Sequence, residues 1–443
     1  MKRYERYKDS DVQWIGEIPE HWEVKRAKFM FNKEKREVRD CDDVVTCFRD
    51  GQVTLRKNRR TTGFTESLTE IGYQGVRKGD LVIHQMDAFA GSIGVSDSDG
   101  KGTSVYHCCT PKGAYNVHYY ANLIRRMAGS GFIQSLYRGI RERSSDFKFP
   151  VFGNQYLVVP STEEQHAIVG YLKDKTLKID QYVAARERER ELLDSLKQSE
   201  IANVVTKGLN PNAPMKDSGI PWIGLIPEHW EVGNFGKCFT FSKGLPITKS
   251  NLVDKGVAVI SYGQIHDKSN TGTTIHKSLI RYVSPNWLNT NPQCIMNKGD
   301  FAFADTSEDI EGAGNCIYND YSEKLFAGYH TIIARPKDKI NSMYWAYLFQ
   351  NIGWKSQIQS LVNGVKVYSI SKTILKKAYL LIPPISEQRA IVAYLDEKLS
   401  KIDRCLADLQ AEIDYLKEFK QRLISDAVTG QICVAEPQKG EKS

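Results

Sequence analysis

The side chains in this chain that could support catalysis are scattered rather than grouped. His107, Cys108 and Cys109 are adjacent, but the ligand spacing of a zinc site is missing, so a strand that buries alternate side chains is favoured over a metal site. The chain has no Gly-x-x-x-x-Gly-Lys-Ser/Thr loop, and it also lacks the (Asp/Asn)-Pro-Pro-(Tyr/Phe) loop of an adenine methyltransferase. We therefore predict no catalytic, metal-binding or cofactor-binding residue in this chain.

Chemistry suited to binding is present instead. Residues 49–60 carry five basic side chains against one acidic side chain, in a turn-rich stretch followed by hydroxyl groups. Basic groups bind phosphates, and Arg and Gln side chains donate to base edges. We predict DNA contacts from the following residues of the first half: Arg49, Gln52, Arg56, Lys57, Arg59, Arg60, Thr61 and Gln85.

Polar loops of similar character occur in the second half, at residues 243–251, 261–274 and 305–314. The candidate DNA-binding residues there are Lys243, Thr248, Lys249, Tyr262, Gln264, Lys268 and Thr306. Composition alone does not separate DNA-binding loops from solvated loops, so both interpretations stay open for both halves.

Composition limits the class of protein. With 443 residues the chain is too long for one ordinary core, so we expect two or more domains. The net charge of +8 is modest. The charged N-terminus is unlike a signal peptide, and no segment approaches the roughly 18 apolar residues of a membrane span. Nine cysteines without a Cys-x-x-Cys pair indicate reduced thiols and a cytoplasmic protein without a membrane role.

An internal repeat organises the elements that must position these residues. Residues 8–24 and 216–232, which contain WIGEIPEHWEV and WIGLIPEHWEV, are identical at 13 of 17 positions. A second repeat matches residues 160–180 with residues 383–403. The stretches between the matched phrases barely resemble each other, and the second is about 15 residues longer. Matched frames around divergent contents predict one architecture that presents two different surfaces.

The repeated phrase itself is predicted to be an anchor for each variable block. Its tryptophans carry a large apolar area, and its glycine and proline suit a tight turn. His21 and His229 could be ligands or bases, but we interpret them as structural because site signals need convergent partners. The anchor residues are Trp14, Pro19, Trp22, Trp222, Pro227 and Trp230.

Each second repeat opens a long amphipathic helix, with Ser or Thr and Glu-Gln as helix openers. Apolar residues recur at alternating steps of four and three, which predicts a coiled-coil seam. Two seam slots of the first helix hold Arg186 and Arg190. We favour a solvated face, with the long Arg stems lying along the partner helix, over a polar register pin. The seam residues are Leu172, Ile179, Val183, Leu193, Leu395, Leu399, Ile402, Leu406, Leu409, Ile413 and Leu416.

The variable blocks contain short β-branched runs between turn residues, and one or two helical stretches each. The predicted fold class is therefore α+β, with two globular domains of mixed α and β structure separated by two long helices that pair as an antiparallel coiled coil, in a pseudo-twofold internal repeat. The predicted segments are 1–158 (anchor and first domain), 159–212 (first helix), 213–382 (anchor and second domain), 383–434 (second helix) and 435–443 (disordered tail).

This arrangement resembles the specificity (S) subunit of type I restriction–modification enzymes, over essentially the whole chain. The resemblance rests on KDSGIPWIGLIPEHWEV before a variable block, on Pro-x-x-x-Glu-Gln-x-Ala-Ile-Val-x-Tyr-Leu at the start of each long helix, and on the duplicated order. The first copy departs in part, because it reads KDSDVQWIGEIPEHWEV.

The resemblance implies that each variable block is a target-recognition domain for one half of a split DNA sequence, and that the paired helices fix the gap. It implies two methyltransferase (M) subunits and two motor-nuclease (R) subunits as partners. S-adenosylmethionine, ATP and Mg²⁺ would be held by those subunits, and this chain would be non-catalytic and act in phage defence. Two other functions stay open: a stand-alone DNA enzyme such as a nuclease, and a coiled-coil adaptor without a DNA role.

Overall fold

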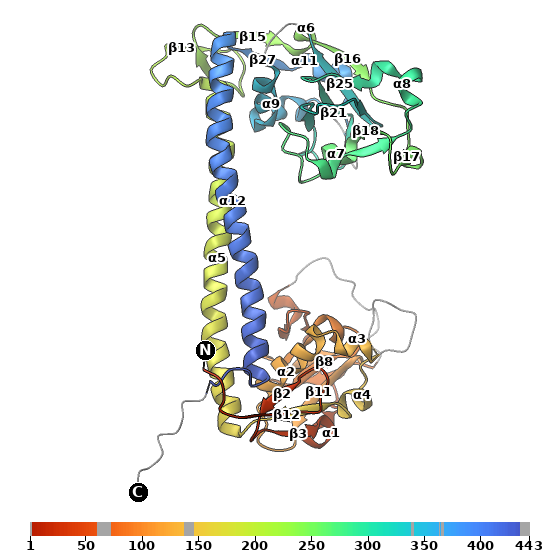
Figure 1. Cartoon of the computed structure of the whole chain (residues 1–443), viewed down its shortest axis with the longest axis vertical. Coiled ribbons are helices and arrows are strands. Elements are labelled where there is room, and N and C mark those ends of the chain that lie inside the picture. The colour runs from red at the N-terminus through yellow and green to blue at the C-terminus, as the bar shows by residue number, and fades with distance from the viewer. Residues whose placement is uncertain are drawn as a thin grey trace. The chain divides into compact units, whose positions relative to one another are not determined.

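The structure is a computed structural model that describes residues 2–59, 72–136, 146–337, 341–362, 364 and 367–434. The chain divides into two compact units, and Figure 1 labels many of their elements. Unit 1 combines Met1–Glu187 with Ala411–Ser443, and unit 2 is Arg188–Gln410. The predicted tail, residues 435–443, lies outside the described residues.

Unit 1 contains short strands and a few helices. Its strands are β1 (Tyr7–Asp9), β2 (Glu17–Pro19), β3 (Glu23–Arg26), β4 (Phe31–Glu34), β5 (Val45–Cys47), β6 (Val53–Leu55), β7 (Gln74–Val76), β8 (Leu81–His84), β9 (Ile93–Val95), β10 (Gly100–Gly102), β11 (Tyr106–Pro111) and β12 (Tyr156–Val159). Its shorter helices are α1 (Ala27–Met30), α2 (Val117–Gly129), α3 (Phe132–Ser135) and α4 (Phe149–Gly153), with 3₁₀ turns η1 (Arg56–Asn58) and η2 (Ala88–Ala90).

Unit 2 repeats this plan with additional elements. Its strands are β13 (Met215–Asp217), β14 (Leu225–Pro227), β15 (Glu231–Asn234), β16 (Phe239–Lys243), β17 (Leu252–Val253), β18 (Val257–Ile260), β19 (Arg281–Val283), β20 (Ile295–Met296), β21 (Phe301–Ala304), β22 (Thr306–Ser307), β23 (Cys316–Tyr318), β24 (Leu325–Ala327), β25 (Thr331–Pro336), β26 (Tyr368–Ser369) and β27 (Tyr379–Ile382). Its shorter helices are α6 (Phe235–Cys238), α7 (Tyr262–Ile265), α8 (Trp287–Thr290), α9 (Ser342–Gln350), α10 (Ile352–Gln359) and α11 (Lys372–Lys377), with 3₁₀ turns η3 (Lys249–Asn251), η4 (Lys277–Leu279) and η5 (Pro292–Cys294).

Both units are built on the same four-stranded antiparallel sheet. Its order is β4-β11-β8-β9 in unit 1 and β16-β25-β21-β23 in unit 2. The repeated phrase forms the same hairpin in each unit, β1-β2 and β13-β14, and the strand after it pairs with the strand that precedes the long helix. The mixed α and β domains predicted from the sequence are therefore confirmed.

The two units differ outside this shared sheet. Unit 2 has a five-stranded sheet of order β17-β19-β18-β24-β20, in which β18 and β24 run parallel. The corresponding part of unit 1 contains the two-stranded pairs β5-β6 and β10-β7. The longer second block thus carries a larger sheet on the same base.

The strand β11 corrects one expectation from the sequence. We predicted that it buries alternate side chains, but Tyr106, His107, Cys108 and Cys109 are all buried. The reason is that both faces of this sheet are covered by apolar clusters. Tyr106 and Cys108 belong to one cluster with β5 and β6, and Cys109 belongs to the larger cluster that includes α2.

Two long helices support the units: α5 spans Thr162–Lys207 and α12 spans Ile385–Val428. Their halves pair antiparallel within each unit, because the partner's number falls as the residue number rises. In unit 1, Lys420 Nζ lies 2.6 Å from Asp180 Oδ1, and Lys417 Nζ lies 2.9 Å from Glu187 Oε1. In unit 2, Lys197 pairs with Asp403, and Tyr394 donates to Glu200. The predicted antiparallel pairing is confirmed within each unit.

The predicted seam residues face the interior of these helix pairs. In unit 1, Leu172, Ile179, Val183 and Ile413 are buried, and Leu416 packs against them. In unit 2, Leu395, Leu399, Ile402 and Leu409 are buried, and Leu193 and Leu406 pack against the core.

The two seam arginines reach the other helix of their own unit. Arg186 Nε donates to Glu412 Oε1 at 3.2 Å, and Arg190 Nη1 donates to Gln410 Oε1 at 2.5 Å. These cross-helix contacts favour the polar register pin over a purely solvated face, since each pair is made only in one alignment of the helices.

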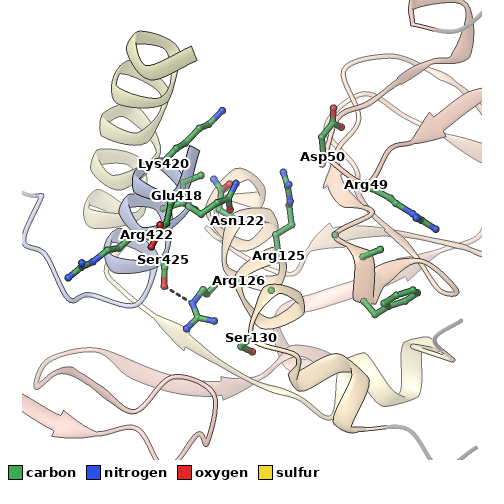
Figure 2. Close-up of a pocket in the computed structure, with 16 residues that line it drawn as sticks. Arg49, Asp50, Asn122, Arg125, Arg126, Ser130, Glu418, Lys420, Arg422 and Ser425 are labelled. Atoms are coloured by element: carbon green, nitrogen blue, oxygen red, sulfur yellow. Dashed lines mark hydrogen bonds between the residues drawn. The ribbon is translucent and has the colours of Figure 1, made fainter. Parts of the chain in front are cut away.

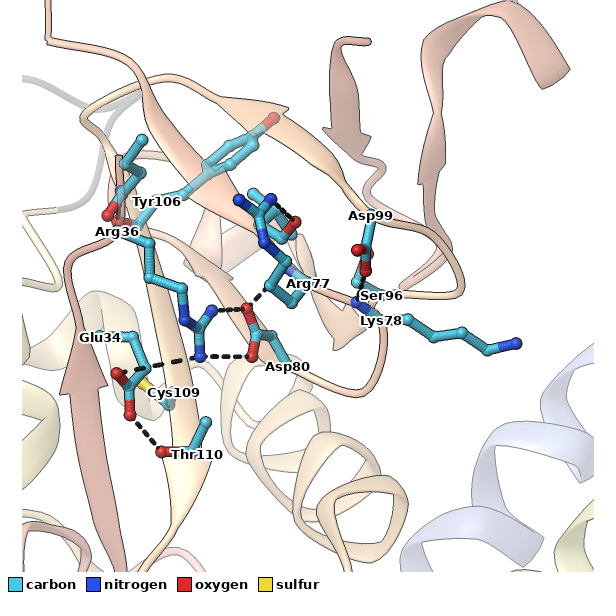
Figure 3. Close-up of polar contacts among 12 residues, drawn as sticks. Glu34, Arg36, Arg77, Lys78, Asp80, Ser96, Asp99, Tyr106, Cys109 and Thr110 are labelled. Atoms are coloured by element: carbon cyan, nitrogen blue, oxygen red, sulfur yellow. Dashed lines mark hydrogen bonds and ion pairs between the residues drawn. The ribbon is translucent and has the colours of Figure 1, made fainter. Parts of the chain in front are cut away.

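A buried ion pair holds the turn before β8 in unit 1 (Figure 3). The Asp80 carboxylate accepts the Arg77 N–H at 2.8 Å and pairs with Arg36, whose Nη2 lies 3.1 Å from Asp80 Oδ1. Removing one partner of such a pair leaves a buried charge unbalanced. The pair therefore stabilises the turn.

Unit 2 makes the same turn with an arginine from a different strand. Asp300 accepts the Asn297 N–H at 2.8 Å and pairs with Arg335 Nε at 3.1 Å. Arg36 follows β4, whereas Arg335 lies in β25, so the carboxylate is kept and its partner is exchanged. Residues 76–81 and 296–301, which read VRKGDL and MNKGDF, thus form one structural feature that occurs in both units.

Candidate nucleic-acid interface

In unit 1 the repeated phrase ties the globular block to α5 through a single carboxylate. His21 Nε2 lies 2.9 Å from Glu164 Oε1, and Trp22 Nε1 donates to the same oxygen at 3.2 Å. The Tyr4 hydroxyl donates to it at 3.1 Å. Burial raises the pKa of Glu164, but hydrogen bonds from His21, Trp22 and the Ser161 N–H outweigh it and bring the pKa below its usual value. We call Glu164, His21 and Trp22 the latch of unit 1.

Unit 2 contains an equivalent latch. His229 Nε2 lies 2.8 Å from Glu387 Oε2, and Trp230 Nε1 donates to the same oxygen at 3.0 Å. Both histidines, which we interpreted as structural, therefore bind the first-turn glutamate of a long helix. The Glu-Gln openers of these helices thus have a second role besides starting the helix.

The helix starts differ between the two copies. Ser161 caps α5 as predicted, because its hydroxyl accepts the Glu164 N–H at 3.2 Å and Glu164 Oε2 accepts the Ser161 N–H at 3.1 Å. By contrast, α12 begins at Ile385, so Ser386 lies in the first turn.

The glutamine of each opener fixes the start of a helix in the adjacent domain. Gln165 Oε1 accepts the N–H of Asn116, the residue before α2, at 2.8 Å. Gln388 Oε1 accepts the N–H of Asn341, the residue before α9, at 3.3 Å. Each glutamine also donates to the carbonyl of the proline five residues earlier. The long helix therefore sets the position of α2 or α9 in its unit.

A buried tyrosine closes the end of the other long helix in each unit. The Tyr119 hydroxyl donates to the Val428 carbonyl at 2.7 Å, and the Tyr344 hydroxyl donates to the Val205 carbonyl at 2.9 Å. These carbonyls belong to the last turns of α12 and α5, which have no intrahelical donor. Each globular domain is thereby bonded to both helices of its unit.

The anchor residues pack against the cores of their units. Trp14, Pro19, Trp22, Pro227 and Trp230 are buried. Trp222 is partly buried and packs against the core of unit 2. Gly430 has φ +74°, and a Cβ there would lie 2.4 Å from the Pro19 ring. The anchor therefore requires glycine at the end of α12.

The basic stretch of unit 1 is less positive than its sequence suggests. Three of its cations have acidic partners: Arg49 with Asp87, Lys57 with Asp43 and Arg59 with Asp50. Asp43 and Asp87 come from outside residues 49–60, so the charge excess counted along the sequence is partly cancelled in space. DNA contact by this stretch remains a prediction.

The other residues of unit 1 that we predicted to contact DNA lie in different local environments. Gln52 is exposed, and Arg56 lies in η1 with its Nε 3.4 Å from the Thr46 hydroxyl. Gln85 Nε2 donates to Asp146 Oδ1 at 2.8 Å. Arg60 and Thr61 lie outside the described residues.

A groove of about 930 Å³ in unit 1 is lined by α2, the last turns of α12 and the loop at Arg49 (Figure 2). Its cations are Arg49, Arg125, Arg126, Lys420 and Arg422, and its carboxylates are Asp50 and Glu418. A concave surface with an excess of one sign of charge concentrates counter-ions such as phosphates. The sequence indicated only Arg49 among these cations.

The predicted residues of unit 2 fall in two places. Tyr262 and Thr306 line a pocket of about 780 Å³ together with His266 and His330. Gln264 lies in α7, where its side-chain oxygen accepts the Ser261 N–H at 3.0 Å and caps that helix. Lys243, Thr248, Lys249 and Lys268 are exposed and are not among the residues that line this pocket.

The pocket of unit 2 carries the opposite charge to the groove of unit 1. It includes the carboxylates of Glu308, Asp309 and Glu311. His266 Nε2 bonds the Thr306 carbonyl at 2.8 Å, which connects α7 to β22. The two units therefore present chemically different surfaces on equivalent frames.

The suspected metal residues are packed in the core. Burial lowers the pKa of His107 to about 4, so its imidazole is neutral at pH 7. Among the described residues no three His, Cys, Asp or Glu side chains are arranged to hold a metal ion. All nine cysteines are free. Within the same ranges no helix is both long and apolar enough to span a bilayer.

Two unlike surfaces, each tied to the same helical frame by the same contacts, define a duplicated two-domain binding scaffold. Residues 227–414 match the family model of the type I restriction modification DNA specificity domain. The match begins at Pro227, at the end of β14, and covers the second variable block and most of α12. The similarity to the family model is therefore to this part of the chain.

Relatives extend the likeness to the rest of the chain. The MjaVIII specificity subunit of Methanocaldococcus jannaschii is 24% identical over 287 residues, which are 64% of this chain and 64% of that protein. The putative MjaX specificity subunit of the same organism is 22% identical and covers 95% of this chain and 96% of its own.

A solved structure shows the same fold. It is described as the structural basis of complex assembly and conformational transition of the type I R-M system. It superposes with a TM-score of 0.70 at 16% identity, over 94% of this chain and 99% of its own. The resemblance to type I specificity subunits that the sequence predicted is confirmed by these matches.

Proposed function

We propose that this chain is the non-catalytic DNA-recognition subunit of a type I restriction–modification complex, and that each unit reads one half of a split target. The observation that carries the proposal is the duplicated frame. His–Glu and Trp–Glu contacts, the glutamine tie and the tyrosine cap recur in both units. The groove and the pocket presented on that frame differ.

The same duplication supports two equivalent partners. A surface that occurs twice in one chain can seat two copies of one protein. We propose that these are two methyltransferase (M) subunits, joined by two restriction (R) subunits. S-adenosylmethionine, ATP and Mg²⁺ are assigned to those subunits, and the DNA-bound complex is assigned to the cytoplasm.

Methylome sequencing tests this function. Co-expression of the chain with its host's M subunit should give adenine methylation at one bipartite motif, and the chain alone with S-adenosylmethionine should methylate nothing. Exchanging residues 25–158 for the corresponding block of another such subunit should change one half-site only. A swap that alters both half-sites together would contradict the two-reader model.

Two outcomes would instead favour the other functions. Divalent-metal-dependent cleavage of DNA by the purified chain would indicate a nuclease. Absence of any salt-dependent, sequence-selective shift of DNA, with the M subunit present, would indicate an adaptor without a DNA role.

A further inference from the structure

Arg125 is the cation of the unit 1 groove without a hydrogen-bonding partner in the described part of the chain. It lies in α2 and extends toward the loop at Asp50 (Figure 2). Burial lowers its pKa, because the guanidinium has lost much of its water. Within the residues that the structure describes, its side chain makes neither a hydrogen bond nor an ion pair. A partly desolvated guanidinium whose N–H donors are unpaired can bind an anion.

The nearest carboxylate does not supply that anion. Asp50 lies beside Arg125 and attracts it electrostatically. However, one Asp50 oxygen accepts from Arg59 at 2.7 Å, and the other accepts from the Gln52 N–H at 3.1 Å. Asp50 is therefore occupied by its own loop.

The backbone is shaped to receive the guanidinium. Gly51 has φ +90°, and a Cβ at this position would lie 1.9 Å from Arg125 Nη1. Gly91 has φ +91°; a Cβ there would lie 2.7 Å from the Arg49 carbonyl oxygen and in ordinary contact, at 4.0 Å, with Arg125 Nε. Only glycine combines this conformation with so close an approach at Gly51. Arg125 thus occupies a slot made by two loops.

Other cations continue from this slot toward α12. Arg126 is held there because its Nε donates to the Ser425 hydroxyl at 2.5 Å. Arg422 is exposed, with its Nε 3.6 Å from Asp426 Oδ2. A single small anion would fill little of a groove of about 930 Å³, whereas a nucleic-acid strand presents phosphates in series.

The equivalent position of unit 2 carries no charge. Counting from Asn116 and Asn341, the residues before α2 and α9, the counterpart of Arg125 is Gln350. It too meets a positive-φ glycine, since a Cβ at Gly272 would lie 1.7 Å from Gln350 Nε2. That nitrogen is buried without a partner among the described residues. The packing is repeated, but the cation is specific to unit 1.

We propose that the groove of unit 1 binds a backbone phosphate of duplex DNA. The Arg125 guanidinium would donate paired N–H groups to this phosphate, with Arg126 beside it. This contact positions unit 1 without reading bases. Because Arg126 is held by Ser425, the site combines the variable block with the helical frame. The inference rests on the proposed function and names one contact of that function.

The test uses the full-length chain and a labelled random-sequence DNA duplex, with affinity measured by fluorescence anisotropy over a range of NaCl concentrations. Arg125→Gln copies the unit 2 residue and keeps the side chain long. The slope of log affinity against log salt should become less negative by about 0.9, and binding should weaken about tenfold or more at low salt. Arg125→Lys should keep the slope, since it keeps the charge.

Gln350→Ala is the matched control, because it truncates the equivalent side chain and removes no charge; its slope should equal the wild-type slope. Circular dichroism confirms that each variant folds, and Arg125→Lys carries the comparison if Arg125→Gln does not. For Arg125→Lys the expected result is then a several-fold loss of DNA affinity at an unchanged salt slope, because lysine lacks the paired N–H donors of the guanidinium; wild-type affinity would overturn the inference.

The outcomes separate this inference from the proposed function. If the wild-type chain with its M subunit selects one sequence, but Arg125→Gln keeps the wild-type salt slope, the phosphate site is wrong and the recognition function stands. If Arg125→Gln lowers the slope while the wild type selects no sequence, the phosphate site stands and the recognition function falls.

Discussion

Replacing Glu164 by alanine should release the repeated phrase from α5 in unit 1. Its carboxylate accepts hydrogen bonds from His21, Trp22, Tyr4 and the Ser161 N–H. Alanine leaves the indole N–H of Trp22, a fully buried side chain, without its acceptor. The perturbation therefore removes a shared acceptor rather than a single contact.

The size of the effect follows from these contacts. An orphaned buried donor costs about 1–3 kcal/mol. Glu164 accepts from several donors and its side chain is 11% exposed, so we expect the upper end of this range, about 3 kcal/mol. Glu387 accepts from His229 and Trp230 and is 22% exposed, so Glu387→Ala should cost less, about 2 kcal/mol.

Hydrogen–deuterium exchange measures this effect with an internal control. In Glu164→Ala, peptides covering residues 14–24 should exchange about a hundredfold faster, because about 1.4 kcal/mol corresponds to a factor of ten. Peptides covering residues 222–232 should keep the wild-type rate. Glu387→Ala should produce the reverse pattern. Glu164→Gln keeps one acceptor oxygen and should have a smaller effect.

Two results would refute this reasoning. Unchanged exchange at residues 14–24 in Glu164→Ala would mean that the carboxylate does not hold the phrase. Equal acceleration of both phrases by either variant would mean that the latch contributes only to global stability.

Three further predictions concern other parts of the chain. The pKa of His107 is about 4 in the folded state and about 6.5 unfolded, so the unfolded chain gains a proton as the pH falls from 7 to 5, and the stability of unit 1 should fall by about 2 kcal/mol. Urea unfolding at both pH values measures this loss, which His107→Leu should remove. An equal loss in the variant would contradict the prediction. Gly430→Ala should destabilise the end of α12 by about 3 kcal/mol. Gly219 has φ +70° but open space around it, so Gly219→Ala should cost only about 1 kcal/mol of backbone strain. Similar melting temperatures for the two variants would argue against close packing at Pro19. Inserting one heptad into both α5 and α12 should lengthen the gap in the methylated motif and leave both half-sites unaltered, as read by methylome sequencing; a changed half-site would contradict the spacer role.

The repeat is what made the frame predictable. Two nearly identical phrases must fold alike, and heptad spacing extends over most of α5 and α12. The partner of the repeated His-Trp pair was not predicted, because Glu164 lies 142 residues from Trp22 in the chain. The sequence did contain a signal for this partner, because the glutamate occurs in the second repeat of each half.

The candidate DNA surface was less predictable because charge acts through space. The cations of residues 49–60 appeared unopposed in sequence, yet Asp43 and Asp87 fold back to two of them. Arg125 appeared as an ordinary helix cation, and only the close approach of Gly51 marks its position as a built slot. Sequence comparison of α2 with α9 gives the change to Gln350 but not its surroundings.

Unit 2 is one continuous segment whereas unit 1 is made of two, and this difference has a consequence for synthesis on the ribosome. Unit 2 is one uninterrupted segment, Arg188–Gln410, and all of its helix pairing lies within that segment. Unit 1 needs Ala411–Ser443 as well as the N-terminal segment, since Tyr119 caps α12 at Val428 and Tyr7 donates to the Gly430 carbonyl. Domains usually complete folding from the N-terminus as the chain emerges. In this chain the order is reversed: the domain made first is completed last, and a nascent chain that stops near residue 410 leaves it without the second helix of its frame.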